Sequence, residues 1–222
     1  MIAAVVPVAF FIEDHIDMTV RFLDRLHDEV DRIGVWHNGG PLAEEGWRAL
    51  GIFKSLDLFP AEEMTFYAMW NAGAVWATGI GADALLVLNN DIDWPPGALR
   101  ALGEALVTAA PDIAVASPDP AAEFHPDGLK DIFATPAYRG LIGWCFAVRP
   151  QLWQPIDERY LSWYGDDEFG LLMHAAGYRC VRASGIPAWH DETETTMRHV
   201  PNIWDVRAAD EQLYLSKWGS RP

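Results

Sequence analysis

The sequence is poor in basic residues. Lys and Arg number 16 against 32 Asp and Glu, which gives a formal net charge of −16. Such a charge repels the phosphate backbone of nucleic acids and the anionic surface of membranes, so we expect no nucleic-acid partner. If so acidic a protein binds a diphosphate, it needs a local positive charge. A divalent cation is the natural source of that charge.

Cysteine and long apolar runs are also scarce. Cys145 and Cys180 are the only cysteines, and their spacing suits no CxxC site. We therefore expect buried free thiols and a reducing, cytoplasmic location, with one disulfide between them as the alternative. No run approaches the ~20 apolar residues that cross a bilayer, so we predict a soluble chain without a membrane span. The apolar run 2–12 lacks a basic leader and contains Pro7, which favours a buried strand over a signal peptide.

Two glycine-rich loops are missing. No GxGxxG follows the first apolar run, and 79–81 has only an isolated Gly-Ile-Gly, which argues against a dinucleotide-binding oxidoreductase. No Gly-rich loop with Arg and Lys follows that run either. This absence argues against a sugar nucleotidylyltransferase.

The chain contains a regular alternation of apolar runs and helix-like segments. Its 222 residues are 50% hydrophobic, which suits a single α/β domain with a mostly parallel sheet covered on both faces. We predict strands at 3–12, 34–37, 53–59, 84–88, 113–117, 141–148 and 178–186. Helices are predicted at 61–78, 95–109, 165–177 and 203–218, and an earlier helix carries an apolar stripe of Ile16, Val20, Leu23, Val30 and Ile33.

Two further features allow two interpretations each. The Pro- and Asp-rich connection 118–140 is long for a loop, and loops of this length commonly act as lids or binding loops. Eleven Trp residues either pack in the core and at its rim or stack on the faces of sugars.

Acidic residues follow the most apolar predicted strand. Asp91 and Asp93 come directly after 84–88, at the edge of an α/β sheet where ligands bind. Two carboxylates one residue apart can share Mg²⁺ or Mn²⁺ beside phosphate oxygens. The alternative is a turn that caps the next helix.

A second acidic cluster begins a later predicted helix. Asp166, Asp167 and Glu168 are consecutive, and acids at a helix N-terminus stabilise the helix dipole without any catalytic role. Crowding also raises the proton affinity of a carboxylate, which suits a general base near neutral pH. His190 follows the last predicted strand and is either structural or a metal ligand.

In their order and gaps these motifs resemble the inverting family-2 glycosyltransferases with the GT-A fold, from about residue 5 to residue 190. The segments that carry the resemblance are 35–40 (VWHNGG), 71–73 (NAG), 86–91 (LVLNND), 143–149 (GWCFAVR), 164–169 (YGDDEF) and 177–178 (GY). The resemblance implies one GT-A domain over 1–222. Its nucleotide-sugar half would be about 1–117, its acceptor and catalytic half about 118–202, and its closing amphipathic helix about 203–218.

The resemblance also implies an activity and a site. A sugar would pass with inversion from a nucleotide diphosphate donor, most commonly a UDP-sugar, to a hydroxyl of a glycan, a lipid-linked acceptor or a protein. Mn²⁺ or Mg²⁺ would stabilise the leaving group. The implied donor contacts are Asn38, Asn71, Asn90 and Asp91, the metal ligands are Asp91, Asp93 and His190, and the catalytic group is Asp166 as base with Asp167 and Glu168.

Three departures from the family pattern leave alternatives open. Gly165 replaces a Glu, so the base assignment can move from Asp166 to Asp167. Asn89 and Asn90 replace the first acid of the metal motif, which implies weaker metal binding, and Leu172 replaces an Arg. A phosphohydrolase with Asp91 as nucleophile and a non-catalytic carbohydrate-binding protein are the rival interpretations.

Overall fold

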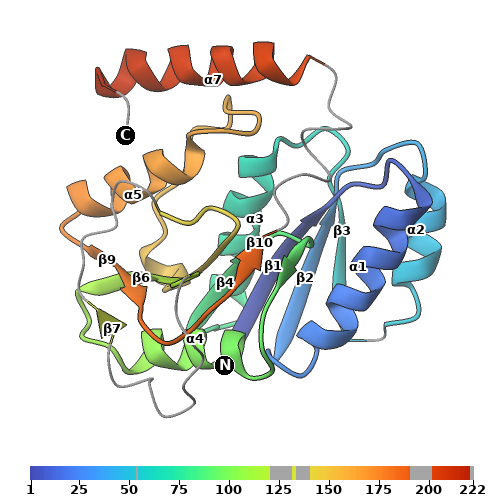
Figure 1. The fold of residues 1–222 in the computed structure, drawn as a ribbon, viewed down its shortest axis with the longest axis horizontal. Helices are drawn as coiled ribbons and strands as arrows, with labels where there is room; N and C mark the ends of the chain where they lie inside the picture. The colour runs from blue at the N-terminus through green and yellow to red at the C-terminus, as the bar shows by residue number, and fades with distance from the viewer. Residues whose placement is uncertain (54, 121–131, 134–140, 191–201, 221–222) are drawn as a thin grey trace.

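A computed structural model describes residues 1–53, 55–120, 132–133, 141–190 and 202–220 (Figure 1). The strands are β1 (Ile2–Val8), β2 (Arg32–His37), β3 (Leu56–Pro60), β4 (Ala84–Leu88), β5 (Ile92–Asp93), β6 (Ile113–Pro118), β7 (Ile132–Phe133), β8 (Cys145–Val148), β9 (Arg179–Ala183) and β10 (Trp189–His190). The α-helices are α1 (Glu13–Leu26), α2 (Ala43–Leu50), α3 (Phe66–Gly79), α4 (Ala98–Thr108), α5 (Gly165–Ala175) and α7 (Ile203–Trp218), and η2 (Pro150–Leu152) is a 3₁₀ turn.

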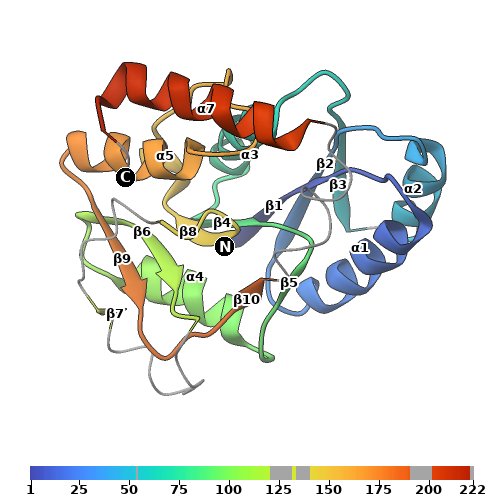
Figure 2. The same ribbon diagram turned by 45° about the horizontal axis from the view of Figure 1, so that its top comes forward.

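Eight strands form one sheet in the order β3-β2-β1-β4-β8-β6-β9-β7. β1, β2, β3 and β4 run parallel, β8 runs antiparallel to both β4 and β6, and β9 is parallel to β6. The remaining two strands, β5 and β10, pair antiparallel as a separate ribbon beside the end of β4 (Figure 2). The predicted mostly parallel α/β sheet is therefore confirmed.

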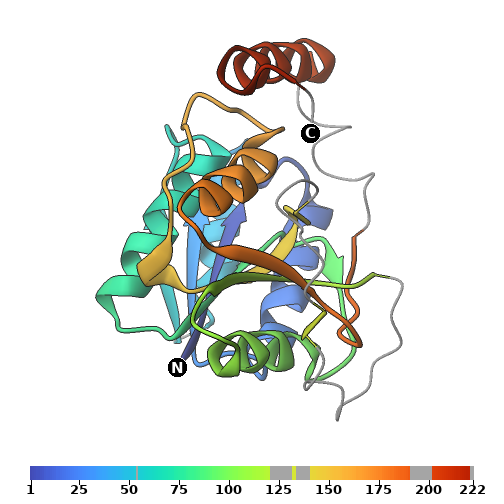
Figure 3. The same ribbon diagram turned by 90° about the vertical axis from the view of Figure 1, so that its left-hand side faces the viewer.

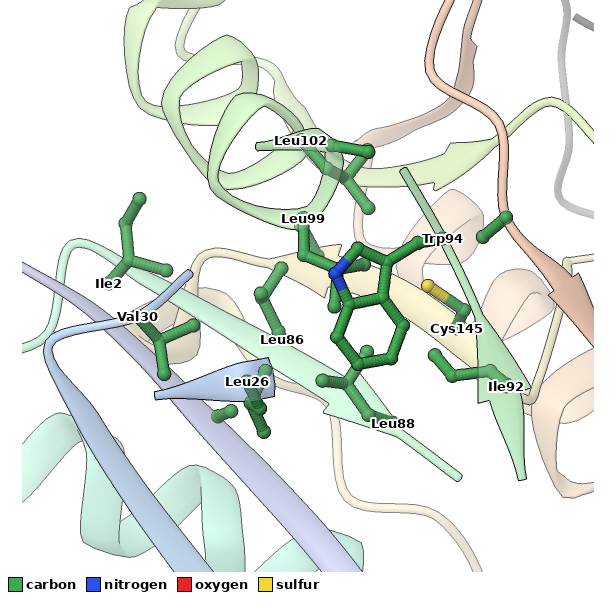
Figure 4. Packing of buried hydrophobic residues seen from close by; sticks show 14 of the residues in the cluster. Ile2, Leu26, Val30, Leu86, Leu88, Ile92, Trp94, Leu99, Leu102 and Cys145 are labelled. Atoms are coloured by element: carbon green, nitrogen blue, oxygen red, sulfur yellow. The ribbon is translucent and has the colours of Figure 1, made fainter. Parts of the chain in front are cut away.

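The core consists of two layers, one on each face of the sheet. Along β4, Leu86 and Leu88 face one cluster while Leu85 and Val87 face the other, because successive side chains of a strand point to opposite faces. The first cluster is covered by α1, α2 and α4, and Figure 4 shows Trp94 packed within it. The second is covered by α3 and α5, with α7 as an outer layer beyond α5 (Figure 3).

Several boundaries differ from the predicted ones. The first helix ends at Leu26, so Val30 and Ile33 are not on its stripe, and Ile33 lies in β2. The run 141–148 contains only the short strand β8, and α2 was not predicted. Most of the 118–140 connection lies outside the described residues.

Both cysteines are buried and unpaired, as expected. Burial raises the pKa of the Cys180 thiol to about 12, so this thiol stays protonated. None of the helices in the described part of the chain is long and apolar enough to cross a membrane.

Candidate active site

A cavity opens at the carboxyl ends of β1, β2 and β4. This cavity, named cavity A, has a volume of about 390 Å³ and is lined by Val8, Asn38, Glu62, Asn89, Asn90 and Asp91 among others. The strand order reverses between β1 and β4, and ligands of open α/β sheets bind at such switch points. Three of the four predicted donor contacts, Asn38, Asn90 and Asp91, therefore line one cavity.

Asp91 and His190 meet at the edge of cavity A. The β5–β10 ribbon pairs His190 with Ile92, and this register brings Nε2 of His190 to 3.0 Å from Oδ1 of Asp91. The side chain of His190 is only 17% exposed and that of Asp91 only 9%. The indole of Trp144 stacks on the imidazole at 5.3 Å between ring centroids. Two residues 99 positions apart are thus held in one fixed pair.

Asn89 lies beside this pair. Its Nδ2 is 3.4 Å from Nε2 of His190, while its Oδ1 is buried without a hydrogen-bond partner among the described residues. A buried acceptor without a partner costs free energy, so this oxygen is available to a water, an ion or a polar ligand. Asn89 was not predicted as a site residue, and the available signal was its position two residues before Asp91.

Asp93 does not join the Asp91–His190 pair. Its carboxylate forms an ion pair with Arg25 at 2.7 Å and is 70% exposed, and it also accepts the backbone N–H of Trp94. Within the described ranges no three His, Cys, Asp or Glu side chains lie close enough together to hold a metal ion. Of the three predicted metal ligands, the structure thus brings Asp91 and His190 into contact, with Asn89 next to them, whereas the carboxylate of Asp93 pairs with Arg25. Metal binding by these residues stays a prediction.

A second cavity, cavity B, adjoins cavity A. Its volume is about 380 Å³, and it is lined by Phe66, Trp70, Asn89, Trp144, Asp166 and His190 among others. Asn89, Phe66 and Ser162 line both cavities. Asp91 thus lines one of these two adjoining cavities, and Asp166 and His190 line the other.

Burial governs the chemistry of Asp166. It raises the pKa of this carboxyl to about 7, and the charge of Asp167 adds to the rise, while backbone N–H groups, including that of Gly143, offset part of it. A carboxyl group with a pKa near 7 is half ionised at neutral pH. It is therefore suited to accept a proton there.

Close packing of two glycines positions Asp166. A Cβ atom on Gly143 would lie 2.7 Å from Cγ of Asp166, and one on Gly165 would lie 2.6 Å from Cδ1 of Tyr67. Tyr164, which precedes α5, has a φ of 65°, a conformation that is strained for a bulky residue. Gly165, the departure from the family pattern, is therefore explained by the Tyr67 ring that occupies the space of a side chain.

Glu168 lines neither cavity A nor cavity B. It is fully buried, accepts the backbone N–H of Asp157 at 2.9 Å and the indole N–H of Trp218, and forms an ion pair with Lys217. These bonds connect α5 to α7. The carboxylate of Glu168 is therefore engaged by these partners, and its catalytic role stays a prediction, whereas Asp167 lines the next cavity along together with Asp166.

Asn71 also differs from its expected role. Its Oδ1 accepts the indole N–H of Trp153 and the backbone N–H of Ile156, and its Nδ2 donates to Ile156 O and to Glu158. All its hydrogen-bonding groups join α3 to the segment 153–158, and it does not line cavity A. A Cβ atom added to Gly73 would lie 2.8 Å from the Cβ of Val5, so Gly73 allows α3 to pack closely against β1. The donor contact expected of Asn71 stays a prediction.

Asp210 of α7 is a residue that sequence reasoning missed. It is 2% exposed, and it accepts the backbone N–H groups of Leu161, Ser162 and Trp163 at 2.9–3.2 Å. This loop lines cavities A and B. No local sequence pattern links position 210 to positions 161–163.

No family profile and no curated protein sequence matches the chain. Solved structures do. A mannosyltransferase from Pyrobaculum calidifontis, in complex with GDP-Man and Mn²⁺, superimposes over 100% of this chain and 65% of its own, with a TM-score of 0.66 and 15% identity. The chain has the GT-A fold.

A second structure with this fold is glucosyl-3-phosphoglycerate synthase from Mycobacterium tuberculosis, in complex with Mn²⁺, UDP-Glc and phosphoglyceric acid. It matches over 100% of this chain and 80% of its own, with a TM-score of 0.62 and 14% identity. The chain covers 65% of the length of the mannosyltransferase. At these identities the likeness establishes the GT-A fold, and the chemistry must be argued from the residues of this chain.

Proposed function

We propose that the chain is a glycosyltransferase that moves a sugar from a nucleotide diphosphate donor to an acceptor hydroxyl with inversion. The observation that carries the proposal is the convergence of the Asp91–His190 pair and Asp166 on connected cavities. An inverting transfer needs a leaving-group site on one side of the anomeric carbon and a base on the other. The structures with the same fold bind GDP-Man or UDP-Glc, and for this chain a UDP-sugar is our first choice.

In this proposal residues 1–117 form the donor half, with Asn38, Asn90 and Asp91 in cavity A. Residues 118–202 form the acceptor half with Asp166, and α7 closes it. Because the chain is strongly acidic, the diphosphate requires a compensating cation.

The residues present fit a divalent cation. Asp91 supplies a carboxylate oxygen, His190 an imidazole nitrogen and Asn89 a buried amide oxygen without a partner in the described chain. This mixed oxygen and nitrogen set suits Mn²⁺ better than Mg²⁺. Such an ion would stabilise the negative charge of the departing nucleoside diphosphate.

Asp166 acts as the base in the proposed reaction. Its carboxylate takes the proton of the acceptor hydroxyl while the oxygen forms a bond to the anomeric carbon. The bond from that carbon to the diphosphate oxygen breaks, and the configuration inverts. Asp167 does not line cavity B, lines the next cavity together with Asp166, and remains the alternative base.

The decisive experiment measures nucleotide release from UDP-glucose and GDP-mannose with and without Mn²⁺. The proposal expects metal-dependent release that Asp166→Asn abolishes while donor binding persists. Donor binding without any release by the wild type would instead identify a non-catalytic nucleotide-sugar-binding protein. Thermal shifts with each donor provide the binding measurement, because a ligand of the folded state raises its apparent stability.

A further inference from the structure

A third cavity, cavity C, lies between the start of α5 and α7. Its volume is about 650 Å³, and its lining includes Trp163, Asp166, Asp167, Trp204, Arg207 and Glu211. Trp163 and Asp166 line cavity B as well, so the proposed base lies where cavities B and C adjoin, and neither Asp91 nor His190 lines cavity C. None of the donor contacts proposed above lines it.

Aromatic faces dominate one wall of cavity C. Trp204 is 60% exposed, which is unusual for the largest apolar side chain. The guanidinium carbon of Arg207 lies 6.0 Å from the ring centroid of Trp163 and 5.9 Å from that of Trp204. Two indoles and a guanidinium thus line the same space, with flat apolar faces next to a hydrogen-bond donor.

The described lining of cavity C is more acidic than basic. It contains three acidic side chains, Asp166, Asp167 and Glu211, and one guanidinium, that of Arg207, in a chain whose net charge is −16. A phosphorylated or carboxylated acceptor would be repelled. A neutral sugar matches this lining, because its C–H faces pack on indoles while its hydroxyls bond to carboxylates and a guanidinium.

The wall is held in place independently of any ligand. Asp210 binds the backbone of residues 161–163 to α7, and the same helix carries Trp204, Arg207 and Glu211.

In cavity B, Trp70 is 1% exposed and its indole N–H has no partner among the described residues. This buried donor lines cavity B, which Asp166 also lines, and it needs a polar partner there, either a water or a ligand hydroxyl.

We infer that cavity C binds a neutral saccharide acceptor, stacked on Trp163 and Trp204 with one hydroxyl at Asp166. The inference rests on the proposed glycosyltransferase function. It excludes the acceptor class of the mycobacterial neighbour, whose structure contains phosphoglyceric acid. The acceptor can be the terminal sugar of a larger molecule, since the inference concerns only the residue that reacts.

The test compares acceptors in the nucleotide-release assay with UDP-glucose, GDP-mannose and Mn²⁺. Neutral methyl pyranosides and disaccharides are expected to accelerate release about tenfold or more over water, and phosphoglyceric acid is not. Trp204→Ala should raise the KM of the accepted glycoside about tenfold, which corresponds to one lost stacking contact. Trp204→Phe should stay within about threefold, and Gln212→Ala, an exposed site on the same helix, should match the wild type.

The failures of the two proposals are distinguishable. Acceptor-independent donor hydrolysis reports the proposed function alone and should be equal in the wild type and in the control Gln212→Ala. Saturation-transfer NMR with the methyl pyranosides, without donor, reports saccharide binding alone. Acceleration by phosphoglyceric acid only, no response to any neutral glycoside, or a glycoside KM that Trp204→Ala leaves unchanged would each overturn the inference.

Discussion

A Cβ atom on Gly143 would lie 2.7 Å from both Cβ and Cγ of Asp166, so the backbone of Gly143 forms the wall against which the Asp166 side chain rests. Gly143→Ala should displace the carboxylate and lower transfer by about 10–100-fold, since small misplacements of a catalytic group are costly. The donor-induced thermal shift should persist. Gly79→Ala is the matched control, because an added Cβ there meets nothing within 4 Å. Equal turnover of both variants would contradict the role assigned to Gly143.

Asp166 should control the pH dependence of transfer. Its carboxyl must be ionised to accept a proton, and its pKa is raised to about 7 by burial and by the charge of Asp167. We expect kcat/KM to fall about tenfold for each pH unit below 7 and to level off above it. Asp166→Asn should lower transfer by about 10²–10⁴-fold. A profile that titrates near pH 4 would instead favour an exposed carboxylate as the base.

The same pKa predicts a change in stability. Because the folded-state pKa of Asp166 exceeds its unfolded value of 3.8, the stability that its protonated form contributes is lost as pH rises from about 4 through 7. Asp166→Asn should therefore raise the free energy of unfolding more at pH 8 than at pH 5. Urea denaturation at the two pH values measures this difference. A larger gain at pH 5 would show that the sign is wrong.

Metal dependence should distinguish Asp91 from Asp93. Asp91→Ala removes one member of the pair with His190 and should weaken Mn²⁺-dependent donor binding by about tenfold or more. Asp93→Ala breaks an exposed ion pair with Arg25 and should leave the metal dependence unchanged. Isothermal titration of UDP-glucose with Mn²⁺ and with EDTA measures both. A loss of metal dependence in Asp93→Ala alone would restore Asp93 as a ligand.

Asp210 should contribute to stability out of proportion to its place on the outermost helix. Its buried carboxylate accepts three backbone N–H groups, and hydrogen bonds to charged groups are among the stronger ones. Asp210→Asn should lower the free energy of unfolding by about 2–4 kcal/mol. Asp205→Asn, at an exposed position on the same helix, is the control, and urea denaturation measures both. Equal stabilities of the two variants would show that the loop needs no anchor.

The Asp91–His190 pair illustrates which features of the site can be predicted from local sequence. Each position was predictable, because β4 is a purely apolar run that ends in polar residues and His190 follows the last strand. Their contact was not derivable from local pattern, since it depends on the antiparallel register of β5 and β10 across 99 positions. Only the order of family-like motifs suggested it in advance.

The sequence by itself determined the α/β class, the strands that form the sheet centre, the acidic clusters and the lack of positive charge, because periodicity and composition are local properties. Tertiary structure alone decided which polar groups face the cavities. Asp93, Glu168 and Asn71 are of the expected residue types, yet their side chains bond to Arg25, to α7 and to the segment 153–158. The contacts of Asn89, Gly143 and Asp210 at the site became evident only from the tertiary structure. The direction of a side chain depends on packing and on partners distant in the chain, and neither can be predicted from the spacing of residues in the sequence.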